Sequence, residues 1–291
     1  MGTIVDDAMT TVALVVWVGT VEEKGSVRMA GMVGQPGGCG DSATFRLGLK
    51  NVLGSNWTHG QQRWSRRAPM LERELCGPDG MQAGIYFLLE VNNPPERRSL
   101  RSILRGWDVV RTRGRNDVYS DPAVHRLLSH DEIPLGTTTR QQRYVTVVRY
   151  EHVATGIAWT GATTHLSSSA GTTKEIAAAS RELQGHRLAQ LCREMQVDVL
   201  AADLNNVLVR PDTPRGILED SGQRDWRAVV DVEHADHDTH HALGQPPTIR
   251  GKHLDAIYVA SRVTVLDGRV QITEPESSDH FGLVCTVSVP R

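Results

Sequence analysis

The sequence is poor in cysteine. Only four cysteines occur in 291 residues, and no two have the C-x-x-C spacing of a zinc knuckle or a thioredoxin-like redox site. Both kinds of site are therefore disfavoured. Cys192 and Cys285 fall within apolar patterns and are predicted to be small core residues, whereas a disulfide between Cys39 and Cys76 stays open. This cysteine usage favours a reducing compartment.

A large excess of either charge is also missing. Lys and Arg total 32 and Asp and Glu total 34, which gives a net charge of −2. A strongly basic chain would indicate a polyanionic partner, and this balance does not. Binding to nucleic acid would therefore have to depend on local positive charge or on a bound cation.

A long hydrophobic run is absent as well. The apolar segment TTVALVVWVGT, residues 10–20, is too short to span a bilayer. Asp6 and Asp7 precede it where a signal peptide carries Lys or Arg, and no clear cleavage site follows. We interpret the segment as a strand, with a targeting segment as the less favoured alternative. No transmembrane segment is expected, and a cytoplasmic location is predicted, with secretion left open.

What is present indicates a globular domain. Hydrophobic residues make up 39% of the chain and charged residues 23%, and the length allows one large domain or two small ones. Residues 24–44 are rich in glycine and lack a regular pattern. We therefore divide the chain into residues 1–44, an N-terminal strand and linker that could extend a sheet edge, and residues 45–291, the main domain.

Within the main domain, apolar runs alternate with helical patterns. Strands are predicted over residues 83–91, 143–153, 156–166, 197–206, 252–261 and 281–289. Helices are predicted near residues 68–76 and 174–195, and another begins near Pro95. Because neighbouring strands are often paired as hairpins, a mixed sheet or two stacked sheets flanked by helices is favoured over a purely parallel fold.

Polar residues stand at the ends of these strands. They are Asn51, Glu90, His165, Asp203, Asn205, Asp255, Asp279 and His280. A single polar residue at a strand end is usually part of a turn. A set of this size, each member next to an apolar strand, could instead converge on one cleft.

The order of these residues resembles the endonuclease/exonuclease/phosphatase superfamily, the DNase I-like fold, over about residues 45–290. The motifs are Asn51 in LKNVLGSN, Glu90 in FLLEV, His165 in TTHLSSS, Asp203 and Asn205 in ADLN, Asp255 in HLDAIYV, and Asp279 and His280 in SDHFG. Lys50, Leu89 and Ala202 depart from the aromatic, Gln and Gly that the family often carries there. The resemblance implies an α+β four-layer α/β/β/α sandwich of two mixed β-sheets flanked by helices.

The resemblance also implies an activity, which is divalent-metal-dependent phosphodiester hydrolysis by direct attack of water. Hard oxygen ligands suit Mg²⁺, with Mn²⁺ or Ca²⁺ as alternatives. Glu90, Asn51 and Asp279 are the metal candidates. His280 is the candidate general base, with Asp255 as its partner. Asp203 would orient or deprotonate the water, Asn205 would donate to a phosphate oxygen, and His165 would bind phosphate or assist the leaving group.

Nucleic acid, DNA or RNA, is the favoured substrate. A phosphatase or phospholipase-type esterase acting on a small or lipid phosphate is one alternative, and a non-cleaving phosphate-binding scaffold is another. Residues 96–115 contain seven arginines and two acids and could hold a phosphate backbone, although a solvated helix face explains them equally well. Arg113 and Asn116 are secondary candidates for substrate contact. The histidine-rich segment 233–241 has no fixed ligand spacing, and we interpret it as a loop on the substrate side.

Overall fold

The computed structural model of the chain describes residues 41–54, 63–136, 141–170, 172–228, 239–240, 252–272 and 276–291. The strand predicted over residues 10–20, the glycine-rich segment up to residue 40 and Cys39 lie outside these ranges. The first described strand, β1 (Ser42–Asn51), begins just before the expected start of the main domain. The division of the chain at residue 44 stays a prediction.

The described β-strands form two six-stranded sheets. The strand order is β11-β12-β1-β2-β4-β3 in the first sheet and β5-β6-β7-β8-β10-β9 in the second. The parallel neighbours are β1 with β2 and β7 with β8, and the remaining pairs are antiparallel. The strands after β1 are β2 (Ile85–Leu89), β3 (Asp108–Val110), β4 (Asp117–Ser120), β5 (His125–Gly136), β6 (Arg143–His152), β7 (Ile157–His165), β8 (Val199–Asp203), β9 (Arg224–Asp225), β10 (Asp255–Val259), β11 (Thr264–Gln271) and β12 (Gly282–Pro290).

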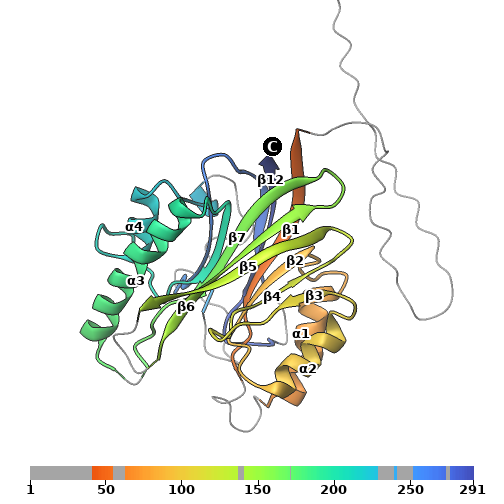
Figure 1. Ribbon diagram of the computed structural model, residues 1–291. Coiled ribbons are helices and arrows are strands. Elements are labelled where there is room, and N and C mark those ends of the chain that lie inside the picture. The colour runs from red at the N-terminus through yellow and green to blue at the C-terminus, as the bar shows by residue number, and fades with distance from the viewer. Residues whose placement is uncertain are drawn as a thin grey trace, which may run out of the picture. The chain divides into compact units, whose positions relative to one another are not determined.

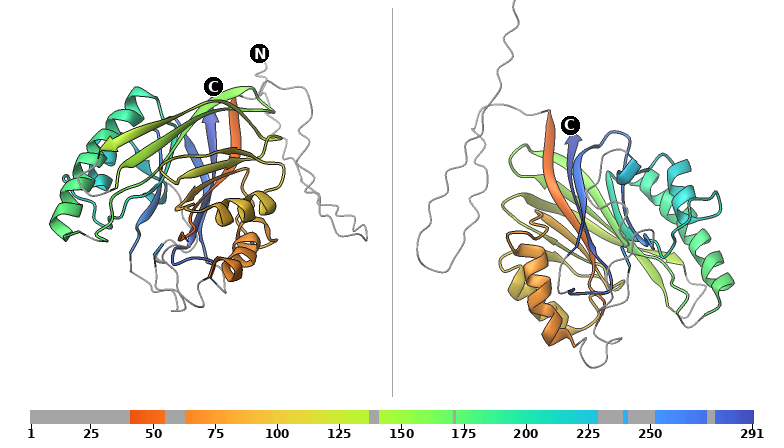
Figure 2. Two further views of the ribbon diagram at one scale, coloured as in Figure 1. Left: turned by 60° about the horizontal axis from the view of Figure 1, so that its bottom comes forward. Right: turned by 180° about the vertical axis from the view of Figure 1, so that it is seen from behind.

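Helices cover the outer faces of both sheets. The helices are α1 (Trp64–Cys76), α2 (Pro94–Ile103), α3 (Lys174–Glu194) and α4 (Pro214–Asp220), with a short 3-10 helix η3 (Trp226–Ala228). α1 and α2 lie together on one side of the sandwich and α3 and α4 on the other (Figures 1 and 2). The predicted four-layer α/β/β/α sandwich is confirmed. None of the helices in the described ranges is long and apolar enough to cross a membrane.

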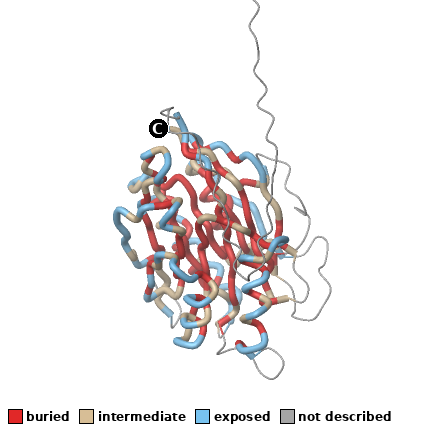
Figure 3. The backbone as a smooth tube through the Cα atoms, turned by 90° about the vertical axis from the view of Figure 1, so that its right-hand side faces the viewer, coloured by how far each residue is buried: buried red, intermediate tan, exposed pale blue. Residues whose placement is uncertain are grey.

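Three apolar layers hold the sandwich together. The central one lies between the two sheets and includes Phe45, Phe87 and Trp159. A second cluster packs α3 and α4 on the second sheet, and a third packs α1 and α2 on the first. Figure 3 shows the buried residues concentrated along the strands. Because side chains alternate along a strand, each sheet buries one face centrally and the other against its helices.

Several elements were not predicted from the sequence. β5 is an edge strand, and most of its residues are exposed or half-buried. It also contains Pro134, which is tolerated at a sheet edge but breaks the pattern that a strand prediction needs. The predicted helix near residues 68–76 begins earlier, at Trp64, and includes Pro69. β3, β4, β11 and α4 were also missed.

Candidate active site

The strand register places the predicted site residues at one end of the sandwich. β1 and β2 are parallel, as are β7 and β8, and the hydrogen bond from Asn51 to Asp203 shows that the two pairs finish at the same end. His165 lies opposite Asp203 in this register, and Asp255, which begins the antiparallel strand β10, also lies opposite Asp203. β12 runs antiparallel to β1, so the residues that precede it arrive beside Asn51.

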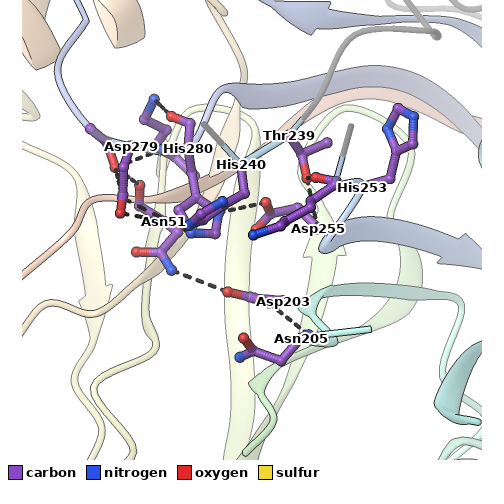
Figure 4. A network of polar contacts seen from close by, with 12 residues as sticks. Asn51, Asp203, Asn205, Thr239, His240, His253, Asp255, Asp279 and His280 are labelled. Atoms are coloured by element: carbon purple, nitrogen blue, oxygen red, sulfur yellow. Dashed lines mark hydrogen bonds and ion pairs between the residues drawn. The ribbon is translucent and has the colours of Figure 1, made fainter. Parts of the chain in front are cut away.

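Asn51 joins the two sheets at this end. Its amide nitrogen donates to Glu90 Oε1 at 3.2 Å and to Asp203 Oδ2 at 3.2 Å, and its amide oxygen accepts from the Leu53 amide at 3.0 Å (Figure 4). Glu90 has a positive φ of 60°, and its Oε2 accepts from the Gly54 amide at 3.2 Å. A left-handed conformation at a non-glycine residue is strained and is typical of functional sites. Asn51 and the Gly54 amide therefore each hold one carboxylate oxygen of Glu90 in place.

His165 and Asn205 surround the buried carboxylate of Asp203. His165 Nε2 lies 3.5 Å from Asp203 Oδ2, and Nδ1 lies 3.7 Å from Glu90 Oε1. The backbone amide of Asn205 donates to Asp203 Oδ1 at 2.8 Å, and its side chain donates to the Leu166 carbonyl at 3.0 Å. Burial disfavours a charged carboxylate, but His165 and other neighbours outweigh this cost and lower the pKa of Asp203.

His280 and Asp255 form the second buried pair of the site. His280 Nδ1 donates to Asp255 Oδ2 at 2.7 Å, and the two side chains are 6% and 1% exposed. Burial disfavours the imidazolium, yet the negative charge and hydrogen bond of Asp255 raise the pKa of His280 to about 10. The Asp255 amide donates to Thr239 Oγ1 at 3.0 Å. Nε2 of His280 is thereby left for the cleft.

Asp279 diverges from His280 and meets another histidine. Asp279 Oδ1 lies 4.0 Å from His280 Nε2, and Oδ2 lies 3.9 Å from His240 Nε2 (Figure 4). The rings of His240 and His280 meet edge to face at 4.8 Å. His240 belongs to the histidine-rich segment, whose other three histidines lie outside the described residues. The expectation that this segment reaches the substrate side agrees with the position of His240.

Six of the eight predicted residues, together with His240, line a cleft of about 720 Å³. The other two, Asn51 and Asp255, are hydrogen-bonded to residues that line it. Glu90 and Asp279, whose side chains are 20% and 23% exposed, both face it, and neither has a Lys or Arg partner within 4 Å in the described ranges. Asp203 with Asp255 and His280 forms one group that could hold a cation, and His240 with Asp279 and His280 forms another. Unpaired carboxylates in a cleft are the hard oxygen donors that Mg²⁺ or Mn²⁺ accepts, so the donor set fits a divalent cation.

Two arginines of the cleft were not singled out from the sequence, although one of them, Arg115, lies in the arginine-rich segment 96–115. Arg143 begins β6, and in the described structure its Nε is buried without a hydrogen-bond partner. Burial lowers the pKa of its guanidinium, which Asp203 and Glu90 partly offset. Arg115 has a positive φ of 63°, lines the cleft and donates to Asn92 Oδ1 at 3.0 Å. Because β6 is antiparallel to β7, a polar residue at the start of β6 should have been considered together with His165.

The two secondary candidates lie elsewhere. Arg113 is exposed and does not line the cleft. Asn116 is buried, and its backbone amide donates to Thr112 Oγ1 at 2.8 Å. The arginine-rich segment therefore reaches the cleft through Arg115. The left-handed backbone conformation of Arg115 changes the direction of the chain, and no sequence pattern predicted this turn.

Comparison with solved structures identifies the fold. The chain resembles an endonuclease/exonuclease/phosphatase family protein from Bacteroides thetaiotaomicron, with 14% identity, a TM-score of 0.72 and coverage of 86% of this chain and 99% of that one. It also resembles a mannosyl-6-phosphatase of the same organism, with 14% identity, a TM-score of 0.66 and coverage of 83% and 98%. A third match is D. rerio TDP2 complexed with a single-stranded DNA product, with 17% identity, a TM-score of 0.64 and coverage of 84% and 98%.

These similarities establish that the chain has the fold of endonuclease/exonuclease/phosphatase proteins, which confirms the fold that the sequence motifs implied. No family model matches the chain, and the comparison with curated proteins finds no match. The solved structures of this fold include a phosphatase and a protein bound to a DNA product. The fold by itself therefore does not choose between these substrates.

Proposed function

We propose that the chain is a divalent-cation-dependent phosphodiester hydrolase that acts on nucleic acid. One observation carries the proposal, which is the composition of the cleft. It combines carboxylates that lack a Lys or Arg partner within the described ranges, three imidazoles and a guanidinium whose Nε is buried. Hydrolysis of a phosphodiester requires a cation or guanidinium for the phosphate charge, an activated water and help for the leaving oxygen. This cleft offers a group for each requirement.

Glu90 and Asp279 would hold the cation, with Asn51 fixing the direction of the Glu90 carboxylate through its amide nitrogen. A bound divalent cation neutralises phosphate charge and lowers the pKa of a nearby water and of a nearby imidazole. The carboxylate oxygens match Mg²⁺, which is commonly held by one or two carboxylates together with waters.

His280 is proposed to accept the proton of the attacking water at Nε2. Asp255 fixes the ring by accepting the hydrogen bond from Nδ1, so the free nitrogen is directed toward the cleft. Asp203 would orient the same water, because its pKa is lowered and its carboxylate is kept charged. Asn205 and His165, on either side of Asp203, are placed to donate to phosphate oxygens. The pair of His280 and Asp255 therefore acts as base and orienting group.

The guanidinium of Arg143 supports a phosphate substrate, because it lines the cleft and its buried Nε has no hydrogen-bond partner among the described residues. Arg115 adds positive charge beside it. Arg98, Arg101 and Arg105 are exposed on and just after α2, from which the chain leads to Arg115. Exposed arginines outside the cleft could contact the backbone of a polynucleotide, which a small phosphate ester lacks, and so support a nucleic-acid substrate.

The test is incubation of the purified chain with supercoiled plasmid, single-stranded DNA, RNA and bis(p-nitrophenyl) phosphate, in Mg²⁺, Mn²⁺ or EDTA. Cut strands that appear with metal and disappear with EDTA are expected. Release of inorganic phosphate from monoesters without cut strands would replace the proposal by a phosphatase. Retained binding of nucleic acid without metal-dependent turnover would replace it by a scaffold.

A further inference from the structure

We propose that Lys50 and Glu74, which lie outside the cleft, are positioning residues that hold the loop carrying Asp279 and His280. The inference rests on the proposed function only where turnover is measured. Both side chains are almost fully buried, at 2% and 1% exposure, and Lys50 Nζ lies 2.7 Å from Glu74 Oε1. A buried ion pair costs desolvation and is weak evidence for stability by itself. The contacts that the pair makes therefore require another explanation.

Strand alternation places Lys50 behind the site. Asn51, the next residue of β1, turns toward the other sheet and contacts Asp203. Because successive side chains of a strand point to opposite faces, Lys50 points toward α1. Its counterpart Glu74 belongs to the buried face of α1, together with Arg67 and Leu71. A helix of the outer layer thus presents charged groups to the end of the sandwich that carries the cleft, which we call the active end.

The ion pair holds the loop at two points. Lys50 Nζ donates to the carbonyl oxygen of His280, and Ser277 Oγ donates to Glu74 Oε2. One side chain of the pair therefore contacts the proposed base residue, and the other contacts the start of the same loop. Lys50 is also covalently joined to Asn51, so the pair links the Asn51 end of β1 to the His280 loop.

Further hydrogen bonds close the arrangement. Ser278 Oγ donates to the Asn51 carbonyl at 2.7 Å and accepts from the His280 amide at 3.2 Å. Arg67 donates to the carbonyls of Val52 at 2.7 Å and Ser277 at 2.9 Å. The end of β1 and the residues before β12 are therefore bound to each other and to α1. Catalytic geometry is sensitive to displacements of about 1 Å, which can cost about 100-fold in rate.

Three variants separate positioning from stability. Lys50→Met leaves Glu74 buried without its cation and is expected to lower Tm by about 10 °C. Lys50→Met/Glu74→Leu removes both charges and is expected to recover most of that loss, but it lacks both contacts to the loop. Leu71→Ala loosens the same face of α1, removes no hydrogen bond to the loop, and serves as the destabilised control.

The first readout does not need turnover. In chain labelled with ¹⁵N-histidine, the Nδ1 proton shared between His280 and Asp255 is expected to give a downfield NMR signal that His280→Gln removes. We expect Lys50→Met and the double variant to shift or broaden this signal, whereas Leu71→Ala retains it. A double variant with the wild-type signal, or equal loss of the signal in Leu71→Ala, would overturn the inference.

The second readout is kinetic. With a substrate that the wild type cleaves, the double variant is expected to lose about 10- to 100-fold in kcat with KM nearly unchanged, because loop position and not substrate contact is altered. Recovery of kcat together with Tm would assign the pair a purely structural role. If the wild type cleaves no substrate, the proposed function fails, and the NMR signal still decides the positioning inference.

Discussion

Two buried histidines at opposite ends of the sandwich differ in one respect, and that difference separates the active end from ordinary core. His280 is hydrogen-bonded to Asp255, and its pKa is raised to about 10. His125 is fully buried, and neither ring nitrogen has a hydrogen-bond partner among the described residues. Burial lowers its pKa to about 3, with a smaller contribution from His152. Burial disfavours the charged form of both rings, and at His280 the direct hydrogen bond and charge of Asp255 outweigh it. His165, which lies 3.5 Å from Asp203 without such a short contact, keeps a lowered pKa.

The surroundings of His125 agree with an uncharged ring at this position. Its ring meets Phe45 edge to face at 4.8 Å and Trp159 at 5.4 Å, and it faces His152 across β5 and β6. β6 runs from Arg143 in the cleft to His152 at the far end, so a single strand connects the two environments. Carboxylates of the active end collect in a cleft, whereas the far end packs aromatic rings. The chain thus uses His280 as a hydrogen-bonded polar group at one end and His125 as an apolar ring at the other.

The largest effect is expected when the two histidines are replaced, one at a time, by residues that cannot titrate. His280→Gln is expected to lower kcat by roughly 10³-fold, because it removes the proposed proton acceptor. His125→Phe, in the aromatic cluster, is expected to leave kcat unchanged. Steady-state kinetics with a substrate that the wild type cleaves would measure both. Normal turnover in His280→Gln would refute the role given to this ring.

A second experiment removes the carboxylate partner of His280, so that the surroundings of this ring become more like those of His125. In Asp255→Asn the largest charge that opposes burial at His280 is lost, while Asp203 and Asp279 still favour the imidazolium. The pKa of His280 is expected to fall from about 10 toward its ordinary value of about 6.5. A ¹H–¹⁵N NMR titration of the histidine rings measures the change. A pKa that stays near 10 would show that Asp255 is not the cause of the shift.

The far end predicts a pH dependence of stability. A histidine whose pKa is lowered by folding stabilises the native state above the unfolded pKa of about 6.5, and this contribution is lost progressively as pH falls toward 3. From these two values, His125 is expected to cost about 2 kcal/mol of unfolding free energy at pH 5 relative to pH 7. Urea unfolding of wild type and His125→Phe at both pH values isolates the effect, because the variant retains His152. Parallel losses in the two proteins would contradict the prediction.

The smallest effect is expected for two arginines of the same segment, one inside the cleft and one outside it. Arg115 lines the cleft, whereas Arg113, two positions earlier, is exposed outside it. Arg115→Ala is expected to raise KM for a polynucleotide by about 5- to 10-fold, with a smaller change for bis(p-nitrophenyl) phosphate. Arg113→Ala is the matched control and is expected to leave both KM values unchanged. Equal effects of the two substitutions would restore Arg113 as a substrate contact.

The sequence predicted the elements whose patterns are locally strong. The helix near residues 174–195 is observed as α3, with Thr173 accepting from the Ile176 amide as its cap. The hairpin of residues 143–153 and 156–166 is observed as β6 and β7. β5 was missed because an edge strand with one largely exposed surface does not need a regular apolar alternation. The fold class was predicted through the family motifs, and strand patterns by themselves left a mixed sheet or two stacked sheets open.

For the site, the sequence supplied the residue types at strand ends but not the contacts behind them. Asn51, Glu90 and His280 were singled out because each adjoins an apolar strand. Arg143 starts a strand, so its position at the active end depends on the antiparallel register of β6 and β7. Lys50 and Glu74 are separated by 24 positions and meet only after α1 has packed on the first sheet. Such tertiary contacts leave no local periodicity to detect.

The position of β12 in the first sheet determines how late in synthesis the proposed site can form. β12 is inserted between β11 and β1, and the hydrogen-bonded residues Thr44 and Ser288 are 244 positions apart. On a ribosome, β1 therefore emerges long before the strand that completes its surroundings, and the loop with Asp279 and His280 comes with that late strand. The proposed site is therefore incomplete on a nascent chain until translation has passed these residues.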